Sequence, residues 1–213
     1  MNNRLLKRLA LTAALAGALT SLSACFPLLV GGAMMGGTLV ATDRRTSGSV
    51  LEDEGIEQRA ASRLRESLGE RGHVNVTSYN RQVLLTGEVP NAQDKQLVEQ
   101  VVSRVDNVRN IVNELEVMGN ATLTQRSSDS LVTGRVKAAL VDAKDLFANA
   151  FKIVTERGTT YVMGRVTERE AKRATAVISS TSGVQRVVRI LEIISEDELA
   201  RTLPQKPASG ATK

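Results

Sequence analysis

The chain repeats itself, and this internal repeat is the feature that most limits how it can fold. Residues 74–87 align without gaps with residues 151–164, which lie 77 positions further along, and both segments end in glycine. After the loss of one residue the match resumes between residues 108–117 and 184–193. Two copies of a unit of roughly 68 residues predict two small domains built alike rather than one medium-sized domain.

Each copy shows the same order of hydrophobic periodicities. Apolar residues spaced by four predict an amphipathic first helix in both copies, through Ile56, Ala60, Leu64 and Leu68 and through Val132, Val136 and Leu140. Two short apolar runs on either side of Asn80-Arg81 predict a hairpin. A second helix around residues 97–102 and a third strand at 109–117 complete the copy. The predicted order is αββαβ, an α+β fold with two helices packed on one three-stranded sheet.

Gly87 and Gly164 close the second strand at the same place in the two copies. A glycine fixed in this way indicates a close approach of two backbones or a positive φ rather than chemistry. We expect the first domain at residues 51–118, a polar linker at 119–127 and the second domain at 128–195.

The two ends of the chain carry other signals. Three basic residues precede an apolar run over residues 9–22, which is the layout of a secretory signal and too short for a comfortable membrane span. The run ends in Leu22-Ser23-Ala24-Cys25, which resembles the bacterial lipobox. The lipobox implies removal of residues 1–24 and acylation of Cys25, with residues 25–50 as a flexible tether; the alternative is a plain signal peptide with a chance cysteine. At the other end, residues 196–213 predict a short helix and a disordered tail.

Composition excludes several classes of function. One cysteine and one histidine exclude a disulfide framework, a cysteine zinc site and a multi-histidine metal centre. Aromatic residues make up only 2% of the chain, and removal of the basic signal lowers the net charge from +5 to +2, so nucleic acid is not an expected partner. His73 is read as a solvated turn residue, and the acids at Glu52–Glu54 and Glu168–Glu170 as helix caps. We therefore expect no enzyme, no cofactor and no metal.

Several segments carry a resemblance to a known family. Asn75-Val76-Thr77-Ser78-Tyr79 in the first copy, and residues 162–172 and 182–184 in the second, resemble the BON domain, named for bacterial osmotic-shock and nodulation proteins. With the lipobox and residues 41–45, the chain resembles the dual-BON outer-membrane lipoproteins of proteobacteria. The resemblance implies binding of anionic phospholipid, support of outer-membrane integrity and, in some members, enrichment at the division site. Phe26, where an aspartate is associated with inner-membrane retention, also favours the outer membrane.

A candidate lipid surface lies on the first helix of the second copy. Leu131 falls off the core face, and Arg135 follows it at i+4 with Lys137 nearby, which is how a helix meets an anionic bilayer. The predicted lipid-contacting residues are Leu131, Val132, Gly134, Arg135 and Lys137, with Val76 and Tyr79 of the first hairpin either joining this surface or forming the domain interface. The alternative is that Leu131 packs on the first domain or on the linker.

These observations predict a lipid-anchored periplasmic protein of the outer membrane, enriched at the division septum in some members of the family. Its expected partners are anionic phospholipids such as phosphatidylglycerol and cardiolipin, and the membrane itself through acylated Cys25. The alternative function is a protein-interaction adaptor for an envelope or outer-membrane assembly machine, with the basic helix meeting an acidic protein.

Replacement of Cys25 by alanine should release the protein from membranes or leave it as uncleaved precursor, because the lipobox needs the thiol. Metabolic labelling with palmitate measures this directly. Equal label in the wild type and in Cys25→Ala would contradict the lipobox assignment.

Overall fold

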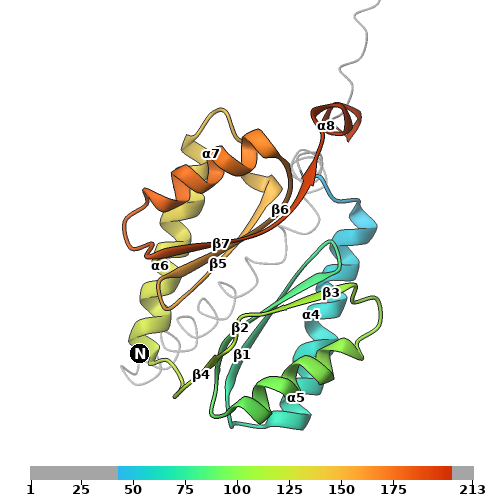
Figure 1. Cartoon of the computed structure of the whole chain (residues 1–213), viewed down its shortest axis with the longest axis vertical. Helices are drawn as coiled ribbons and strands as arrows, with labels where there is room; N and C mark the ends of the chain where they lie inside the picture. Colours follow the sequence, from blue (N-terminus) through green and yellow to red (C-terminus); the bar gives the residue numbers. More distant parts are fainter. Residues whose placement is uncertain (1–42, 203–213) are drawn as a thin grey trace, which may run out of the picture. The chain divides into compact units, whose positions relative to one another are not determined.

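The computed structural model describes residues 43–202 (Figure 1). The signal sequence, Cys25, the tether up to residue 42 and the tail from residue 203 lie outside the described residues. The first repeat consists of α4 (Ser47–Leu68), β1 (His73–Tyr79), β2 (Gln82–Val89), α5 (Ala92–Ser103), β3 (Asn110–Asn113) and β4 (Glu116–Val117). The second consists of α6 (Leu123–Asp142), the 3₁₀ turn η2 (Ala148–Ala150), β5 (Phe151–Glu156), β6 (Thr159–Thr167), α7 (Glu168–Ser179) and β7 (Arg186–Ile194), and α8 (Glu196–Thr202) follows.

The α+β fold with the order αββαβ is confirmed in both repeats. In each sheet the second strand is central: it runs antiparallel to the first strand and parallel to the third. The antiparallel register is the same in the two repeats, with Val74 opposite Gly87 and Phe151 opposite Gly164.

Three boundaries differ from the sequence-based expectation. Helix α4 begins at Ser47 because the Thr46 hydroxyl accepts a hydrogen bond from the Ser49 amide at 3.1 Å. Helix α6 begins at Leu123 because Thr122 caps it in the same way, so half of the predicted linker is helical. The third strand of the first repeat is broken into β3 and β4, whereas β7 of the second is continuous.

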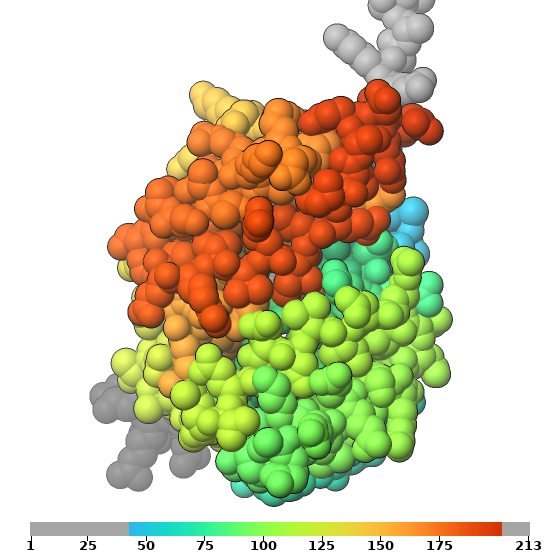
Figure 2. All heavy atoms as spheres, in the orientation of Figure 1, coloured from blue at the N-terminus to red at the C-terminus, as the bar shows by residue number. Residues whose placement is uncertain are grey.

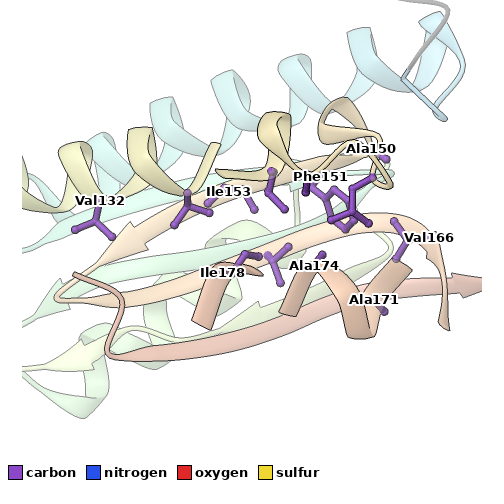
Figure 3. Packing of buried hydrophobic residues seen from close by; sticks show 13 residues of the cluster. Val132, Ala150, Phe151, Ile153, Val166, Ala171, Ala174 and Ile178 are labelled. Carbon is purple, nitrogen blue, oxygen red and sulfur yellow. The ribbon is translucent and has the colours of Figure 1, made fainter. Parts of the chain in front are cut away.

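Each repeat encloses its own apolar core between its helices and one face of its sheet. In the first repeat the fully buried residues include Ile56, Ala60, Val83, Leu85 and Val98. Figure 3 shows the corresponding cluster of the second repeat, which gathers side chains from α6, β5, β6 and α7, with Val132 at one end and Val166 at the other. Both cores lie on the helical faces that the spacing of four predicts.

A third apolar cluster joins the outer faces of the two sheets. Tyr79 and Leu84 from the first sheet pack with Tyr161, Met163 and Ile190 from the second. Strand residues alternate between the two clusters, since Val83 and Leu85 face the helices while Leu84 faces the other sheet. The layers are therefore helices, sheet, sheet and helices (Figure 1). Figure 2 shows the side chains of the second repeat, in orange and red, bordering those of the first, in green.

One buried aspartate in each first helix holds the hairpin turn of its repeat. Asp53 accepts hydrogen bonds from the backbone amides of Asn80 and Arg81, both at 2.7 Å, and from the Ser78 hydroxyl at 2.6 Å. Asp129, at the matching position, accepts from the amides of Arg157 at 2.9 Å and Gly158 at 3.0 Å. The prediction that Glu52–Glu54 cap the first helix was wrong, because the helix begins at Ser47 with no acid in its first turn, and the Asp53 carboxylate points inwards.

Gly87 and Gly164 both lie against a backbone carbonyl where the neighbouring edge strand begins: His73 is the first residue of β1, and Ala150 directly precedes β5. A Cβ on Gly87 would lie 2.0 Å from the His73 carbonyl oxygen, and one on Gly164 would lie 2.6 Å from that of Ala150. Gly87 also has φ +110°, whereas Gly164 has no positive φ. Both glycines are therefore required because the backbone of the preceding segment comes so close. A positive φ at this position occurs only in the first repeat, where the third strand, on the other side of β2, is broken into β3 and β4.

Alanine at either position should destabilise the protein by about 1–3 kcal/mol, because the added methyl group has no space. Alanine at Gly134, in the interior of α6, is the matched control, since a Cβ there meets nothing within 4 Å. It should stabilise by about 0.5–1 kcal/mol. Urea melts measure all three variants, and a loss at Gly134 equal to that at Gly87 would refute the account.

Candidate functional site

The outward face of α6 exposes a row of apolar and small side chains. The inward face is fixed by the buried residues Asp129, Val132, Val136 and Leu140. On the opposite face Leu123 is 79%, Leu131 64% and Val141 68% exposed. Gly134 and Ala138 lie between them at i+3 and i+7 from Leu131, and both are exposed. We call these five residues, Leu123, Leu131, Gly134, Ala138 and Val141, the α6 strip.

Two exposed cations flank the α6 strip. Arg135 and Lys137 are both exposed, and neither forms an ion pair with an acid in the part of the chain that the structure describes. Arg135 donates from Nη1 to the Ser182 carbonyl oxygen at 3.4 Å, which holds its guanidinium beside the turn between α7 and β7. Asp142, near the end of the helix, is the exposed acid of α6. The face can therefore offer apolar contact and positive charge together.

The structure brings together four of the seven predicted lipid-contacting residues: Leu131, Gly134, Arg135 and Lys137 are exposed on α6. The prediction that Val132 contacts lipid was wrong, because this residue is only 4% exposed and belongs to the core of its own repeat (Figure 3). Tyr79 does not join the lipid surface; it takes the predicted alternative of the domain interface, since it is 4% exposed in the cluster between the two sheets. Val76 is half-buried against the first core and does not join the α6 strip.

Sequence reasoning missed both ends of the α6 strip. Leu123 was assigned to the linker, and Val141 was not among the predicted lipid-contacting residues. The signal was present in the helical spacing, since Leu123 precedes Leu131 by eight residues and Val141 follows it by ten. The missing step was the capping residue Thr122, which extends the helix backwards by more than a turn.

The segment Asp43–Arg45 joins the two repeats at the junction of their sheets. Arg44 donates to both carboxylate oxygens of Glu170 in α7, at 2.7 and 2.6 Å, and the two side chains are 3% and 1% exposed. Arg45 instead binds the first repeat, with Nη1 2.8 Å from Asp53 and its guanidinium 4.3 Å from the ring centre of Tyr79. Consecutive arginines therefore bind different repeats, and we call Arg44, Arg45, Asp53 and Glu170 the arginine clamp.

Further polar contacts cross between the repeats. Lys152 lies 2.6 Å from Glu57, and Arg157 lies 2.7 Å from the buried carboxylate of Glu88. The Tyr79 hydroxyl donates to the Ala150 carbonyl at 3.3 Å, and burial together with the nearby Asp43 raises the pKa of Tyr79 to about 12.

His73 is not the solvated turn residue that we predicted. It begins β1, its side chain is 22% exposed, and its Nδ1 lies 3.5 Å from Glu88. Burial and the nearby Arg126 lower the pKa of His73, which favours the neutral imidazole near pH 7.

Within residues 43–202 no group of three or more histidine, cysteine or acidic residues is placed to hold a metal ion. No helix among these residues is both long and apolar enough to cross a bilayer.

Comparison with known proteins identifies the repeat. The family model of the BON domain matches residues 52–119 and again residues 128–194. The chain belongs to the BON domain family. It is 32% identical to the outer membrane lipoprotein DolP of Haemophilus influenzae over 191 residues, which are 89% of this chain and 97% of that one. It is 28% identical to a 21 kDa hemolysin of Actinobacillus pleuropneumoniae, over 71% of this chain and 79% of that one.

The first BON domain lacks the features of the α6 strip. Gly55 occupies the position that matches Leu131, and Arg59 matches Arg135. Arg59 is paired with Glu52 at 2.7 Å, and its guanidinium covers Gly55. Ser128 stands where Glu52 would be in the second BON domain, which leaves Arg135 without that partner. The two domains share a fold, but only α6 presents an exposed leucine beside an unneutralised cation.

Glu170→Gln should destabilise the protein by about 3–5 kcal/mol, because it leaves Arg44 buried without its counter-charge while glutamine keeps the helix cap. Replacing Arg44 and Glu170 together by methionine should cost less than either single change. Glu168→Gln, in the same helix with its partner Lys172 73% exposed, should change stability by less than about 0.5 kcal/mol. Thermal or urea unfolding compares the wild type with Glu170→Gln, Glu168→Gln and the methionine variants. Equal losses of stability for Glu168→Gln and Glu170→Gln would exclude the clamp.

The arginine clamp also predicts that the protein loses stability at acid pH. Burial acts to raise the pKa of Glu170, but hydrogen bonds from Arg44 and Thr167 outweigh it and hold the pKa below its ordinary value. A carboxylate whose pKa is lowered by folding stabilises the protein above its unfolded pKa of about 4.3, and this stabilisation is lost as the pH falls through the folded pKa. Unfolding free energy measured against pH should fall less steeply below about pH 4 in Glu170→Gln than in the wild type.

Proposed function

We propose that this protein is an outer-membrane lipoprotein that binds anionic phospholipid through α6 of its second BON domain. The observation that carries the proposal is the α6 strip: exposed apolar residues on one helix face, with Arg135 and Lys137 beside them and no acidic partner for either within the described chain. This is the composition with which a helix lies on an anionic bilayer surface. The relation to an outer membrane lipoprotein supports acylation of Cys25 and the location at the outer membrane.

The acyl chains and helix α6 contribute different amounts of free energy to membrane binding. Acyl chains contribute about 0.8 kcal/mol per buried CH₂ and so dominate attachment. Burial of Leu131 contributes roughly 1.5–3 kcal/mol, and each cation near an anionic surface about 1 kcal/mol. The helix therefore selects where in the membrane the anchored protein stays rather than whether it is attached. Enrichment at sites rich in anionic lipid, such as a division septum, and support of outer-membrane integrity follow from that selection.

The test uses a soluble fragment of residues 42–213, which corresponds to the compact unit Thr42–Lys213 and lacks the lipidation site. It should bind vesicles that contain phosphatidylglycerol or cardiolipin more tightly than vesicles of phosphatidylcholine alone, with no protein present besides the fragment. No preference for the anionic vesicles would refute lipid binding and favour the alternative of an adaptor for an envelope protein.

Leu131→Glu should weaken binding to anionic vesicles by about 2 kcal/mol or more, roughly 30-fold, because it removes an apolar contact and adds a repelled charge. Leu51→Glu is the matched control, since Leu51 is 71% exposed on α4 of the first domain. It should leave the affinity nearly unchanged. Arg135→Ala should cost about 1 kcal/mol and flatten the salt dependence. If the two glutamate variants lose affinity equally, general electrostatics and not α6 would account for binding.

A further inference from the structure

A second exposed apolar patch lies where the chain enters the first BON domain. Phe147, just after α6, is 46% exposed, and Val141 at the end of α6 is 68% exposed. With Leu146, Ala148 and Asn149 they line a shallow hollow of about 250 Å³. Val141 also belongs to the α6 strip, so the patch continues that face towards one end of the helix.

The arginine clamp fixes the entering chain beside this patch. Arg44 is held by Glu170 and by the Arg165 carbonyl at 3.1 Å, and its guanidinium lies 5.7 Å from the centre of the Phe147 ring. Because Arg44 is nearly fully buried, the point at which residues 25–42 join the described chain stays next to Phe147. These 18 residues can span at most about 60 Å even when fully extended.

Charge at this end of α6 suits an anionic bilayer. Lys137 and Lys144 are exposed, and the acid Asp145 is paired with Arg173 at 2.8 Å, which leaves Asp142 as the exposed acid of α6 without an ion pair among the described residues. A phenylalanine at the edge of a cationic surface is a side chain that enters the boundary between headgroups and acyl chains.

We propose that Phe147 and Val141 form a second lipid contact, on the side of the tether, so that this end of α6 meets the bilayer first. The inference rests on the proposed function, because it takes the acylated residue to be Cys25 and the α6 strip to face lipid. The clamp supplies the geometry: it presents Phe147 at the entry point of the anchored chain in every molecule.

The chain contains no tryptophan, so a single introduced one reports its own surroundings. We would place Phe147→Trp and, as a second reporter, Val141→Trp in the full-length acylated protein, with Val117→Trp in the first domain as the control. Val117 is 50% exposed, which matches Phe147. The proteins are reconstituted in vesicles of phosphatidylcholine and phosphatidylglycerol with brominated acyl chains, which quench only residues that enter the bilayer.

We expect quenching at positions 147 and 141 to exceed that at position 117 by at least about twofold, with a blue shift of emission at both. Quenching no greater than at position 117 for both reporters would overturn the inference. A blue shift that appears without vesicles and rises with protein concentration would assign the patch to a second copy of the chain, and would overturn it as well.

The quenching experiment and the vesicle-binding experiment can fail independently of each other. If the soluble fragment loses vesicle affinity in Leu131→Glu but neither reporter is quenched, lipid binding by the α6 strip stands and the tether-side contact fails. If the reporters are quenched while Leu131→Glu has no effect on the fragment, the tether-side contact stands and the role of Leu131 fails.

Discussion

A three-stranded sheet has two faces, and in each BON domain the helices cover only one of them. The second face must also leave water, since it carries Leu84 in one sheet and Tyr161 and Met163 in the other. Packing these two faces together removes the apolar side chains of both sheets from water and buries Tyr79 between them. The chain is thus built as two αββαβ units that complete each other, and the polar contacts at Glu57, Glu88 and Glu170 surround that apolar contact.

The same packing explains why the two domains are free to differ on their helices. With the sheet faces occupied, α4 and α6 both keep exposed side chains on their outer faces, such as Leu51 and Leu131. The first domain neutralises its arginine with Glu52 and covers Gly55, whereas the second exposes Leu131 and leaves Arg135 without an acid. The differences at these two positions, Glu52 against Ser128 and Gly55 against Leu131, therefore give the outer faces of the two first helices different surfaces.

Much of the architecture could be predicted from the sequence because it depends on local periodicity. The repeat and the two strand-closing glycines follow from comparison of the two copies. The order of elements and the inward residues Ile56 and Val136 follow from the spacing within each copy. For Tyr79 the spacing left both the lipid surface and the domain interface open, because its burial depends on the other domain. Asp53 was misread because its partners, the amides of the hairpin turn, lie 27 and 28 residues away. Val132 was placed on both the core and the lipid surface, and only the direction of its side chain decides between them.

The arginine clamp has a mechanical consequence. A lipoprotein attached by its first residue is pulled from one end whenever membrane and soluble domains move apart, and such a load normally reaches the first domain alone. With Cys25 acylated as proposed, Arg44 would pass this load to the second BON domain through Glu170, and Arg45 would pass it to the first through Asp53. Tension along the tether is therefore shared between both domains and acts across their junction, so that neither has to resist it by the strength of its own hairpin.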